Sequence, residues 1–269
     1  TWGFKLQEGV FFNDAPGWKG TEFTSKDVVH TWRQDTMEDA ALTGAVFWQR
    51  WLPDESHFDV KGPYEIDMHL AVPEPILDFW ASELTFVIQS EDYWNAVGDE
   101  GYAKHPVGTG AFSFVERELN SHFLYEKVDD HWRQTAEMDE LKFALVKEPA
   151  TREAMLLTKE AQLAIVSSTV DGVKRIRERG FKVVNSTQPS NMVEFHWGGQ
   201  YYQLPEGADA KLNPNNPLTK LEVRKALNLA INREELNDVF YGGEMAYMPV
   251  THFFPPSDYG YKSEWVPYP

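Results

Sequence analysis

The side chains of this sequence that could carry acid–base or metal chemistry are its 42 acidic residues and eight histidines, because it has no cysteine. The histidines are scattered, and none is spaced to share a helix face with a second ligand. A phosphate-binding loop, an H-E-x-x-H motif and a G-x-S-x-G motif are all missing. We therefore expect no catalytic residue, no metal and no cofactor. A hydrolase built on two carboxylates remains a less favoured alternative, since sequence gives no distance between acidic groups.

A second group of side chains is better suited to holding a ligand than to reacting with it. Glu194, His196 and Trp197 lie within one short apolar stretch. An indole offers a flat apolar face with one N–H donor, and an imidazole can donate or accept a hydrogen bond. In a strand, alternation would put Glu194 and His196 on one face and Trp197 on the other. Ser167 and Ser168 follow another apolar stretch and are further polar candidates.

The composition limits the classes of protein to which the chain can belong. Its 269 residues are 42% hydrophobic, which is enough for one large domain or two ordinary ones with a buried core. No apolar run approaches the roughly 20 residues that a membrane-spanning helix needs. A net charge of −17 repels phosphate backbones and anionic lipid, so we expect no nucleic-acid partner.

The first half of the sequence alternates between strand and helix patterns. Residues 1–12 alternate like an edge strand, residues 13–17 have turn composition, and residues 101–110 are expected to be a loop. Thr24 and Asp27 form a capping pattern that should start a helix with Val28 and Trp32 on its apolar face. The other predicted strands are residues 64–70, 111–115, 122–127 and 141–146.

The second half continues the alternation. Helices are predicted at residues 152–159 and from Asp171 to Arg179, with Gly180 as the stop signal. Strands are expected at residues 163–166, 181–184 and 192–197. Thr219 and Glu222 form a capping pattern that should start another helix, and Asn232 should start the last one. The whole pattern predicts an α/β fold.

Three stretches in this order and spacing resemble one family. The first comprises residues 4–14 and 23–29, and the third comprises residues 221–236 with Tyr241-Gly242-Gly243. The second is Pro106-Val107-Gly108-Thr109-Gly110-Ala111-Phe112, followed by Asp129-Asp130-His131-Trp132. Together they resemble the extracytoplasmic solute-binding proteins of peptide-type ABC transporters, the dipeptide and oligopeptide-binding family.

The resemblance implies a two-lobed fold of the type II periplasmic-binding-protein kind with an extra middle domain, incomplete at both ends in this chain. Residues 1–104 would form the extra middle domain, residues 105–191 part of the first lobe, and residues 192–269 the start of the second lobe. The motif residues themselves are interpreted as fold markers. Gly108 and Gly110 suit a tight crossing of the chain, and Arg224 is expected to anchor its helix by a salt bridge.

The resemblance also implies a monomeric receptor, periplasmic or otherwise extracytoplasmic and with a lipid anchor left open, that delivers a solute to the membrane subunits of an ABC importer. The ligand would lie where the chain crosses between lobes, beside the five candidates His196, Trp197, Glu194, Ser167 and Ser168. His196 stands where the family often has Asn, and residues 161–165 lack the family's acidic turn. The resemblance makes a peptide the leading ligand, and these departures leave an oligosaccharide as the alternative. A purely structural module is the remaining one.

Overall fold

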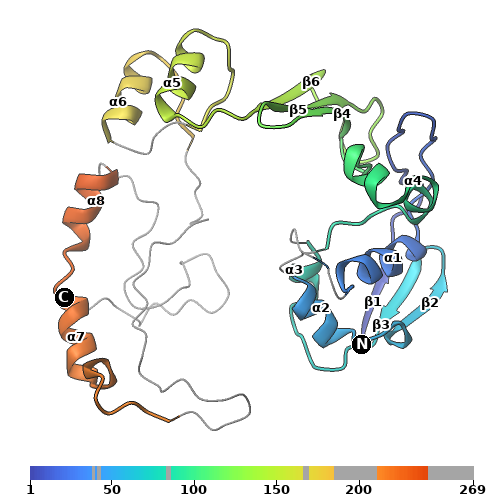
Figure 1. Cartoon of the computed structure of the whole chain (residues 1–269), viewed down its shortest axis with the longest axis horizontal. Helices are drawn as coiled ribbons and strands as arrows, with labels where there is room; N and C mark the ends of the chain where they lie inside the picture. The colour runs from blue at the N-terminus through green and yellow to red at the C-terminus, as the bar shows by residue number, and fades with distance from the viewer. Residues whose placement is uncertain (38–39, 41–43, 83–85, 166–169, 185–210, 242–269) are drawn as a thin grey trace. The chain divides into compact units, whose positions relative to one another are not determined.

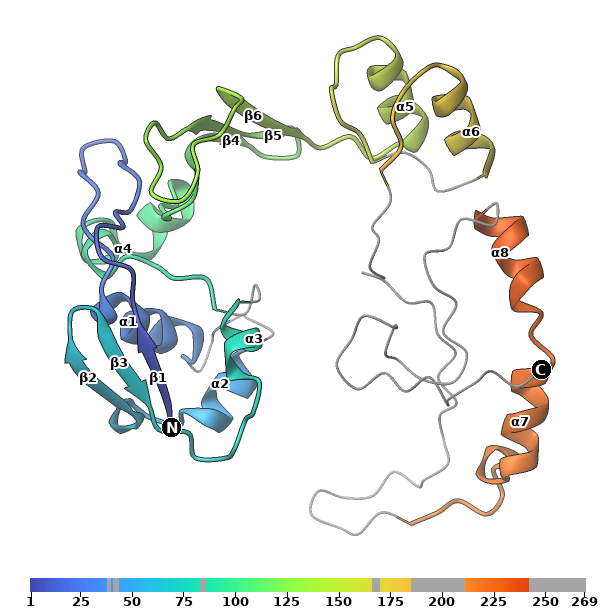
Figure 2. The same ribbon diagram turned by 180° about the vertical axis from the view of Figure 1, so that it is seen from behind.

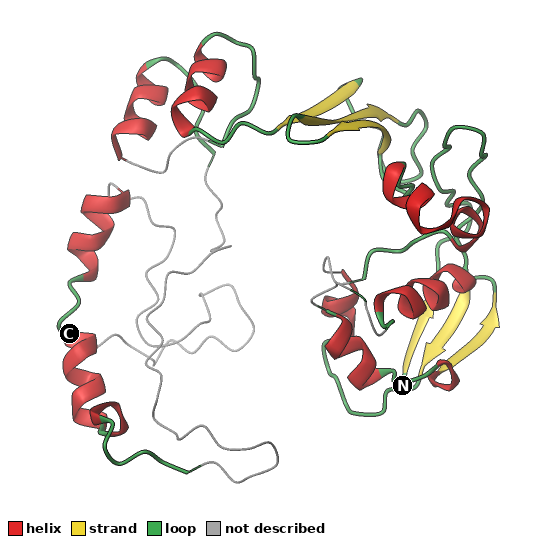
Figure 3. Cartoon of the chain, viewed as in Figure 1, coloured by secondary structure: helices red, strands yellow, loops and turns green. Residues whose placement is uncertain are grey.

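The computed structural model describes residues 1–37, 40, 44–82, 86–165, 170–184 and 211–241. The chain divides into two compact units, Thr1–Leu145 and Val146–Pro269, which are described separately below. Helices and strands alternate through the first unit, whereas the described part of the second unit is helical (Figures 1 and 3). The expected mixture of helix and strand is confirmed.

A three-stranded antiparallel sheet begins the first unit. Its strands are β1 (Trp2–Lys5), β2 (Phe58–Gly62) and β3 (Glu65–Met68), in the order β1-β3-β2. The predicted alternation of β3 is confirmed, because Ile66 and Met68 are buried while Glu65 faces solvent. One face of the sheet therefore belongs to the core, and the other carries charged side chains.

Three helices and one 3-10 turn complete this body: α1 (Ser25–Asp35), α2 (Ala45–Trp51), η1 (Glu55–His57) and α3 (Leu77–Ser82). The predicted capping box of Thr24 and Asp27 starts α1, and Val28 and Trp32 are buried as expected. Helix α1 lies across one face of the sheet, as Figures 1 and 2 both show. The apolar core beneath it includes Trp48, which is fully buried.

Helix α4 (Glu91–Lys104) is a departure from the sequence prediction, which gave residues 101–110 as a loop. Ser90 caps the helix through a hydrogen bond from the amide of Tyr93 to its hydroxyl. Gly98 interrupts it with a φ of +68°, so the chain kinks there before one more turn to Lys104. Glycines at 98 and 101 lower intrinsic helix propensity, and the packing of Tyr93 and Tyr102 outweighs that loss.

A second antiparallel sheet closes the first unit, and all three of its strands match predicted ones. The strands are β4 (Phe112–Glu118), β5 (His122–Lys127) and β6 (Glu140–Ala144), in that order. One face is aromatic, where the ring of Tyr125 lies 5.7 Å from that of Phe114 and 6.0 Å from that of Phe143. The opposite face is largely charged.

The second unit begins with α5 (Pro149–Leu157) and α6 (Val170–Glu178), both predicted. Gly180 adopts a φ of +82° and ends α6, as expected. The strands predicted at residues 163–166 and 181–184 are wrong for the described residues, since 163–165 and 181–184 are irregular. Leu163 and Ile165 are about four-fifths exposed, and a strand without a paired neighbour leaves its backbone groups unsatisfied.

The last described elements are η2 (Pro217–Thr219), α7 (Leu221–Leu229) and α8 (Arg233–Tyr241). The predicted cap of α7 at Thr219 is wrong, because Thr219 belongs to η2 and Lys220 precedes the helix. Asn232 does start α8, with its Oδ1 accepting from the amide of Glu235. In the described part of the chain, no helix has the length and apolarity needed to cross a membrane.

Arg224 anchors α7, but through different partners from those expected. Its Nη1 donates to the carbonyl oxygens of Leu218 and Thr219, at 2.6 and 3.1 Å, and no carboxylate is involved in these contacts. Carbonyls exposed at the end of η2 need donors, and a guanidinium is well suited to supply them. The arginine therefore joins the 3-10 turn to the helix that follows it.

Candidate functional site

The five predicted ligand contacts, Glu194, His196, Trp197, Ser167 and Ser168, lie outside the described residues. Their geometry is therefore left as a prediction. The nearest described residues in sequence are Ile165, whose carbonyl oxygen accepts from Nε of Arg152, and Val170, which begins α6. The site that follows is built from the motif residues of the first unit, whose positions are described.

The first and second motif stretches meet at Asn13. Its backbone amide donates to the carbonyl oxygen of Gly108 at 2.8 Å. Its side-chain Nδ2 donates to the carbonyl oxygens of Gly110 and Phe112, at 3.2 and 3.0 Å. One residue of the turn after the first strand thus binds every second carbonyl of the crossing that leads from α4 to β4. Both stretches were identified from the sequence, but the sequence did not predict that they are in contact.

The later motif residues bind the same crossing through the carbonyl oxygen of Thr109. Nε2 of His131 and Nε1 of Trp132 both donate to this oxygen at 2.9 Å. Nδ1 of His131 lies 3.2 Å from the backbone amide of Gln134 and 3.1 Å from its carbonyl oxygen. The imidazole therefore has a structural role with both nitrogens engaged.

An open hollow of about 540 Å³ lies beside this contact, and residues 109–111 and 131–136 line it. The Arg133 guanidinium lies over the Trp132 ring, 4.7 Å from its centroid, and Trp132 is 41% exposed. A cation over an exposed indole contributes about 0.5–1 kcal/mol. The hollow thus offers a polar rim and one aromatic face.

A buried polar network holds α1 against the start of α4. The Asp27 carboxylate accepts from the amides of Thr24 and Glu91, at 2.8 and 2.9 Å, so it caps α1 and receives an amide of α4 at once. The Thr31 hydroxyl donates to the Asp27 carbonyl and accepts from the amide of Gln89. Burial raises the pKa of Asp27 although both amide bonds lower it.

Tyr102 extends this polar network toward the crossing. Its hydroxyl accepts from the amide of Ser90 at 3.2 Å and donates to the carbonyl oxygen of Val107 at 2.9 Å. Burial raises the pKa of Tyr102 to about 12, so the phenol stays protonated and keeps its donor. The crossing is thereby tied to α4 as well as to the two motif stretches.

Among the buried side-chain atoms of α1, Nε2 of His30 and Oδ2 of Asp35 have no hydrogen-bond partner within the described structure. Burial lowers the pKa of His30 and raises the pKa of Asp35 to about 7. The His30 ring packs against Trp94, 5.7 Å between centroids. Burial favours the neutral form of each side chain, which makes Asp35 a titrating group near neutral pH.

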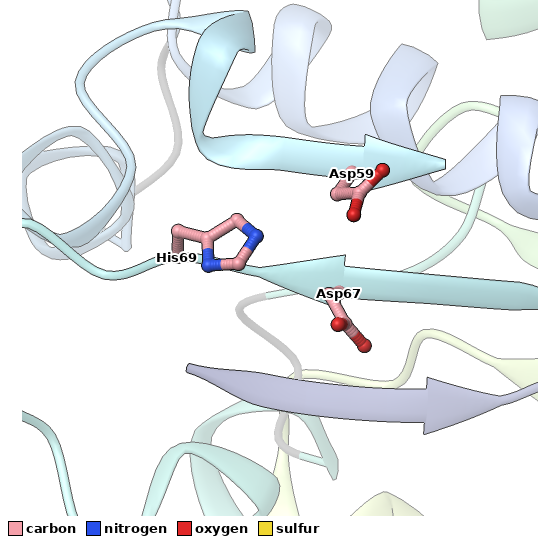
Figure 4. A group of neighbouring side chains, drawn as sticks. All are labelled: Asp59, Asp67 and His69. Atoms are coloured by element: carbon pink, nitrogen blue, oxygen red, sulfur yellow. The ribbon is translucent and has the colours of Figure 1, made fainter. Parts of the chain in front are cut away.

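A group that could bind a metal lies on the solvent face of the first sheet (Figure 4). Asp59 and Asp67 are directly opposite on β2 and β3, and His69 follows two residues after Asp67. One ligand atom from each lies within 4.8 Å of the others. The Lys61 ammonium already pairs with Asp67, and the Thr1 hydroxyl contacts Nδ1 of His69.

We interpret this cluster as an ion-paired surface and assign no metal to it. Like charges directly opposite in a sheet repel, and Lys61 offsets that repulsion here. Sequence analysis missed the group because only the register of β2 and β3 brings Asp59 opposite Asp67. The available signal was the two-residue spacing of Asp67 and His69, which places both side chains on one face.

The comparisons with known proteins agree with the motif order. The model of the bacterial extracellular solute-binding proteins, family 5, middle region, matches residues 1–269. The chain therefore belongs to this family. The family comprises extracellular solute-binding proteins, which confirms the expected family and extracytoplasmic location.

Two curated relatives give the range of similarity. The chain is 25% identical to di/tripeptide-binding protein 1 of Pseudomonas aeruginosa, over 97% of this chain and 48% of the relative. It is 26% identical to the glutathione-binding protein of Salmonella choleraesuis, over 99% of this chain and 46% of the relative. The chain thus spans about half the length of the curated relatives it matches.

A solved structure shows the same fold. The ABC transporter-associated periplasmic binding protein DppA from Helicobacter pylori, in complex with the peptide STSA, superposes with a TM-score of 0.62 at 23% identity. The match covers 99% of this chain and 51% of that protein. The chain is thus a mixed α/β segment that corresponds to about half of a family 5 periplasmic binding protein.

Proposed function

We propose that the chain is part of a receptor that binds a peptide or a similar small polar solute and delivers it to an ABC importer. The observation that carries the proposal is the family match along residues 1–269, with relatives named for di- and tripeptides and for glutathione. The tied motif stretches around Thr109 support it, since they form one connected structure rather than isolated similarities.

In this proposal the complete protein is a two-lobed clamp of the type II kind with an extra middle domain. Residues 1–104 form the middle domain, residues 105–191 belong to the first lobe, and residues 192–269 begin the second lobe. Closure of the two lobes around the solute supplies affinity through burial and hydrogen bonds. The partners are the membrane subunits of the importer, and the receptor acts as a monomer.

The proposed ligand contacts are those predicted from the sequence. Trp197 offers an aromatic face for a peptide side chain, and His196 and Glu194 offer hydrogen-bonding groups on the opposite face of the strand predicted from the sequence. Ser167 and Ser168 contribute hydroxyl groups ahead of α6. A ring that stacks on a peptide side chain also stacks on a sugar, so the peptide class needs a direct test.

Isothermal titration calorimetry on the full-length protein tests the proposal. The protein is refolded once to release retained ligand, then titrated with a mixture of di- and tripeptides and separately with a panel of oligosaccharides. Peptide binding in the micromolar range or tighter supports the proposal. Binding of sugars alone would overturn the peptide assignment, and turnover of either ligand would overturn the receptor.

A further inference from the structure

The crossing at residues 107–112 joins α4 to β4 and contains two glycines close together. Glycine has no Cβ and pays the largest entropic cost when fixed, so a segment of this composition reads as flexible. A chain that connects two sheet-containing bodies through such a segment would normally be expected to bend there. The contacts of the crossing point to the opposite behaviour.

Every carbonyl oxygen from Val107 to Phe112 accepts a hydrogen bond from a group outside the crossing. The donors form two sets that bind alternate carbonyls. Asn13 binds the carbonyls of residues 108, 110 and 112. The side chains of His131 and Trp132 bind the carbonyl of residue 109, and the amide of Val128 binds that of residue 111.

The chain bends at residues 109–111, and donors hold it before, within and after that bend. The donors come from three separate parts of the sequence: the turn after the first strand, the loop after β5, and Tyr102 of α4 at residue 107. Asn13 is half-buried and is the largest single contributor, with one backbone and two side-chain bonds. Bending the crossing would break several of these bonds together.

We propose that residues 107–112 form a rigid connection, in which Asn13 fixes the β4–β5–β6 sheet relative to the body built on the β1–β3–β2 sheet. Any change of shape on solute binding is then located outside this crossing. The inference concerns the mechanics of the first unit and holds whichever solute the protein binds.

Spin labels measure this rigidity directly. Because the chain has no cysteine, Lys5→Cys and Lys142→Cys place one label on each sheet at exposed positions. The full-length protein is used, with any cysteine elsewhere replaced by serine, and double electron–electron resonance gives the distance distribution. A rigid connection predicts a single narrow peak in the distribution of distances between the two labels. A broad or double peak in this parent protein overturns the proposal without any further variant.

Asn13→Asp then tests the role of the side chain. It keeps the shape of Asn13 but replaces the Nδ2 donor by a carboxylate oxygen that faces two carbonyl oxygens. We expect a distribution about twofold broader and faster amide exchange at residues 109–112. Asn95→Asp, at an exposed position of α4, makes the same chemical change and should leave both unaltered.

An unchanged distribution in Asn13→Asp overturns the role of Asn13. Asn13→Ser is a milder second variant for the case in which Asn13→Asp fails to fold, because its hydroxyl keeps one donor at the site. Its distribution should lie between those of the parent and Asn13→Asp. If solute binding is lost while the distance distribution stays narrow, the result contradicts the proposed function and not the rigid connection. The two proposals can therefore be tested separately.

Discussion

The indole Nε1 of Trp132 donates a 2.9 Å hydrogen bond to the carbonyl oxygen of Thr109, 23 residues earlier in the chain. His131 donates to the same oxygen. The shared acceptor joins the two parts of the second motif stretch, which are separate in sequence. Its two lone pairs are both used, so the two donors act on one group and are expected to be energetically coupled.

Trp132→Phe is expected to destabilise the first unit by about 1 kcal/mol through loss of the bond to Thr109. His131→Ala should cost more, because the amide of Gln134 also loses its acceptor. The double variant should differ from the sum of the two by at least about 0.5 kcal/mol. Urea unfolding followed by local hydrogen exchange measures each value, and strict additivity would contradict the coupling.

Asp35→Asn should change how stability depends on pH. The folded pKa of Asp35 is raised to about 7 from 3.8 by burial, so the native state holds a proton that the unfolded state has released. Stability from this group is complete below pH 3.8 and is lost as the pH rises to about 7. The amide stays neutral at every pH and avoids that loss.

Thermal unfolding between pH 4 and 8 measures the effect. The variant should be the more stable protein above pH 7, by an amount on the order of 3 kcal/mol, and the advantage should shrink toward pH 4. Asp99→Asn, at an exposed position of α4, provides the control and should follow the parent. A constant difference at all pH values would exclude titration of Asp35 as the cause.

Gly20→Ala tests the close approach of Gly20 to the backbone of Phe12 in the loop that carries Asn13. A Cβ on Gly20 would lie 1.8 Å from the carbonyl oxygen of Phe12, which is backbone and cannot move aside cheaply. We expect destabilisation of about 1–3 kcal/mol. Gly62→Ala meets no atom within 4 Å and should be nearly neutral. Equal melting temperatures for the two variants would sink the prediction.

The proposed ligand contacts predict a selective loss of affinity. Trp197→Ala and His196→Ala in the full-length protein should each weaken peptide binding by about tenfold, which corresponds to about 1.4 kcal/mol. His69→Ala, at an exposed position directly after β3, is the matched control and should bind normally. Calorimetry gives the affinities, and unfolding midpoints check that the variants are folded. Equal affinities in all three variants would remove these residues from the site.

Local sequence signals predicted the elements whose stability is local. The capping box of Thr24 and Asp27 and the alternation around Ile66 both depend on residues a few positions apart, and both were confirmed. The end of α4 was missed because glycines at 98 and 101 lower helix propensity, and only the burial of Tyr93 and Tyr102 against distant residues restores the helix. The predicted cap at Thr219 failed because Asn216 caps a 3-10 turn there first.

By itself the sequence determined the class of protein, since three ordered stretches and the absence of catalytic motifs are properties of the linear chain. Only the tertiary structure decided which hydrogen bonds join those stretches. Asn13 binds carbonyls 97 and 99 residues away, and no local pattern encodes such a contact. The residue type determines which donors and acceptors a side chain has. The choice of partner depends on which backbone groups the folded core brings within about 3 Å.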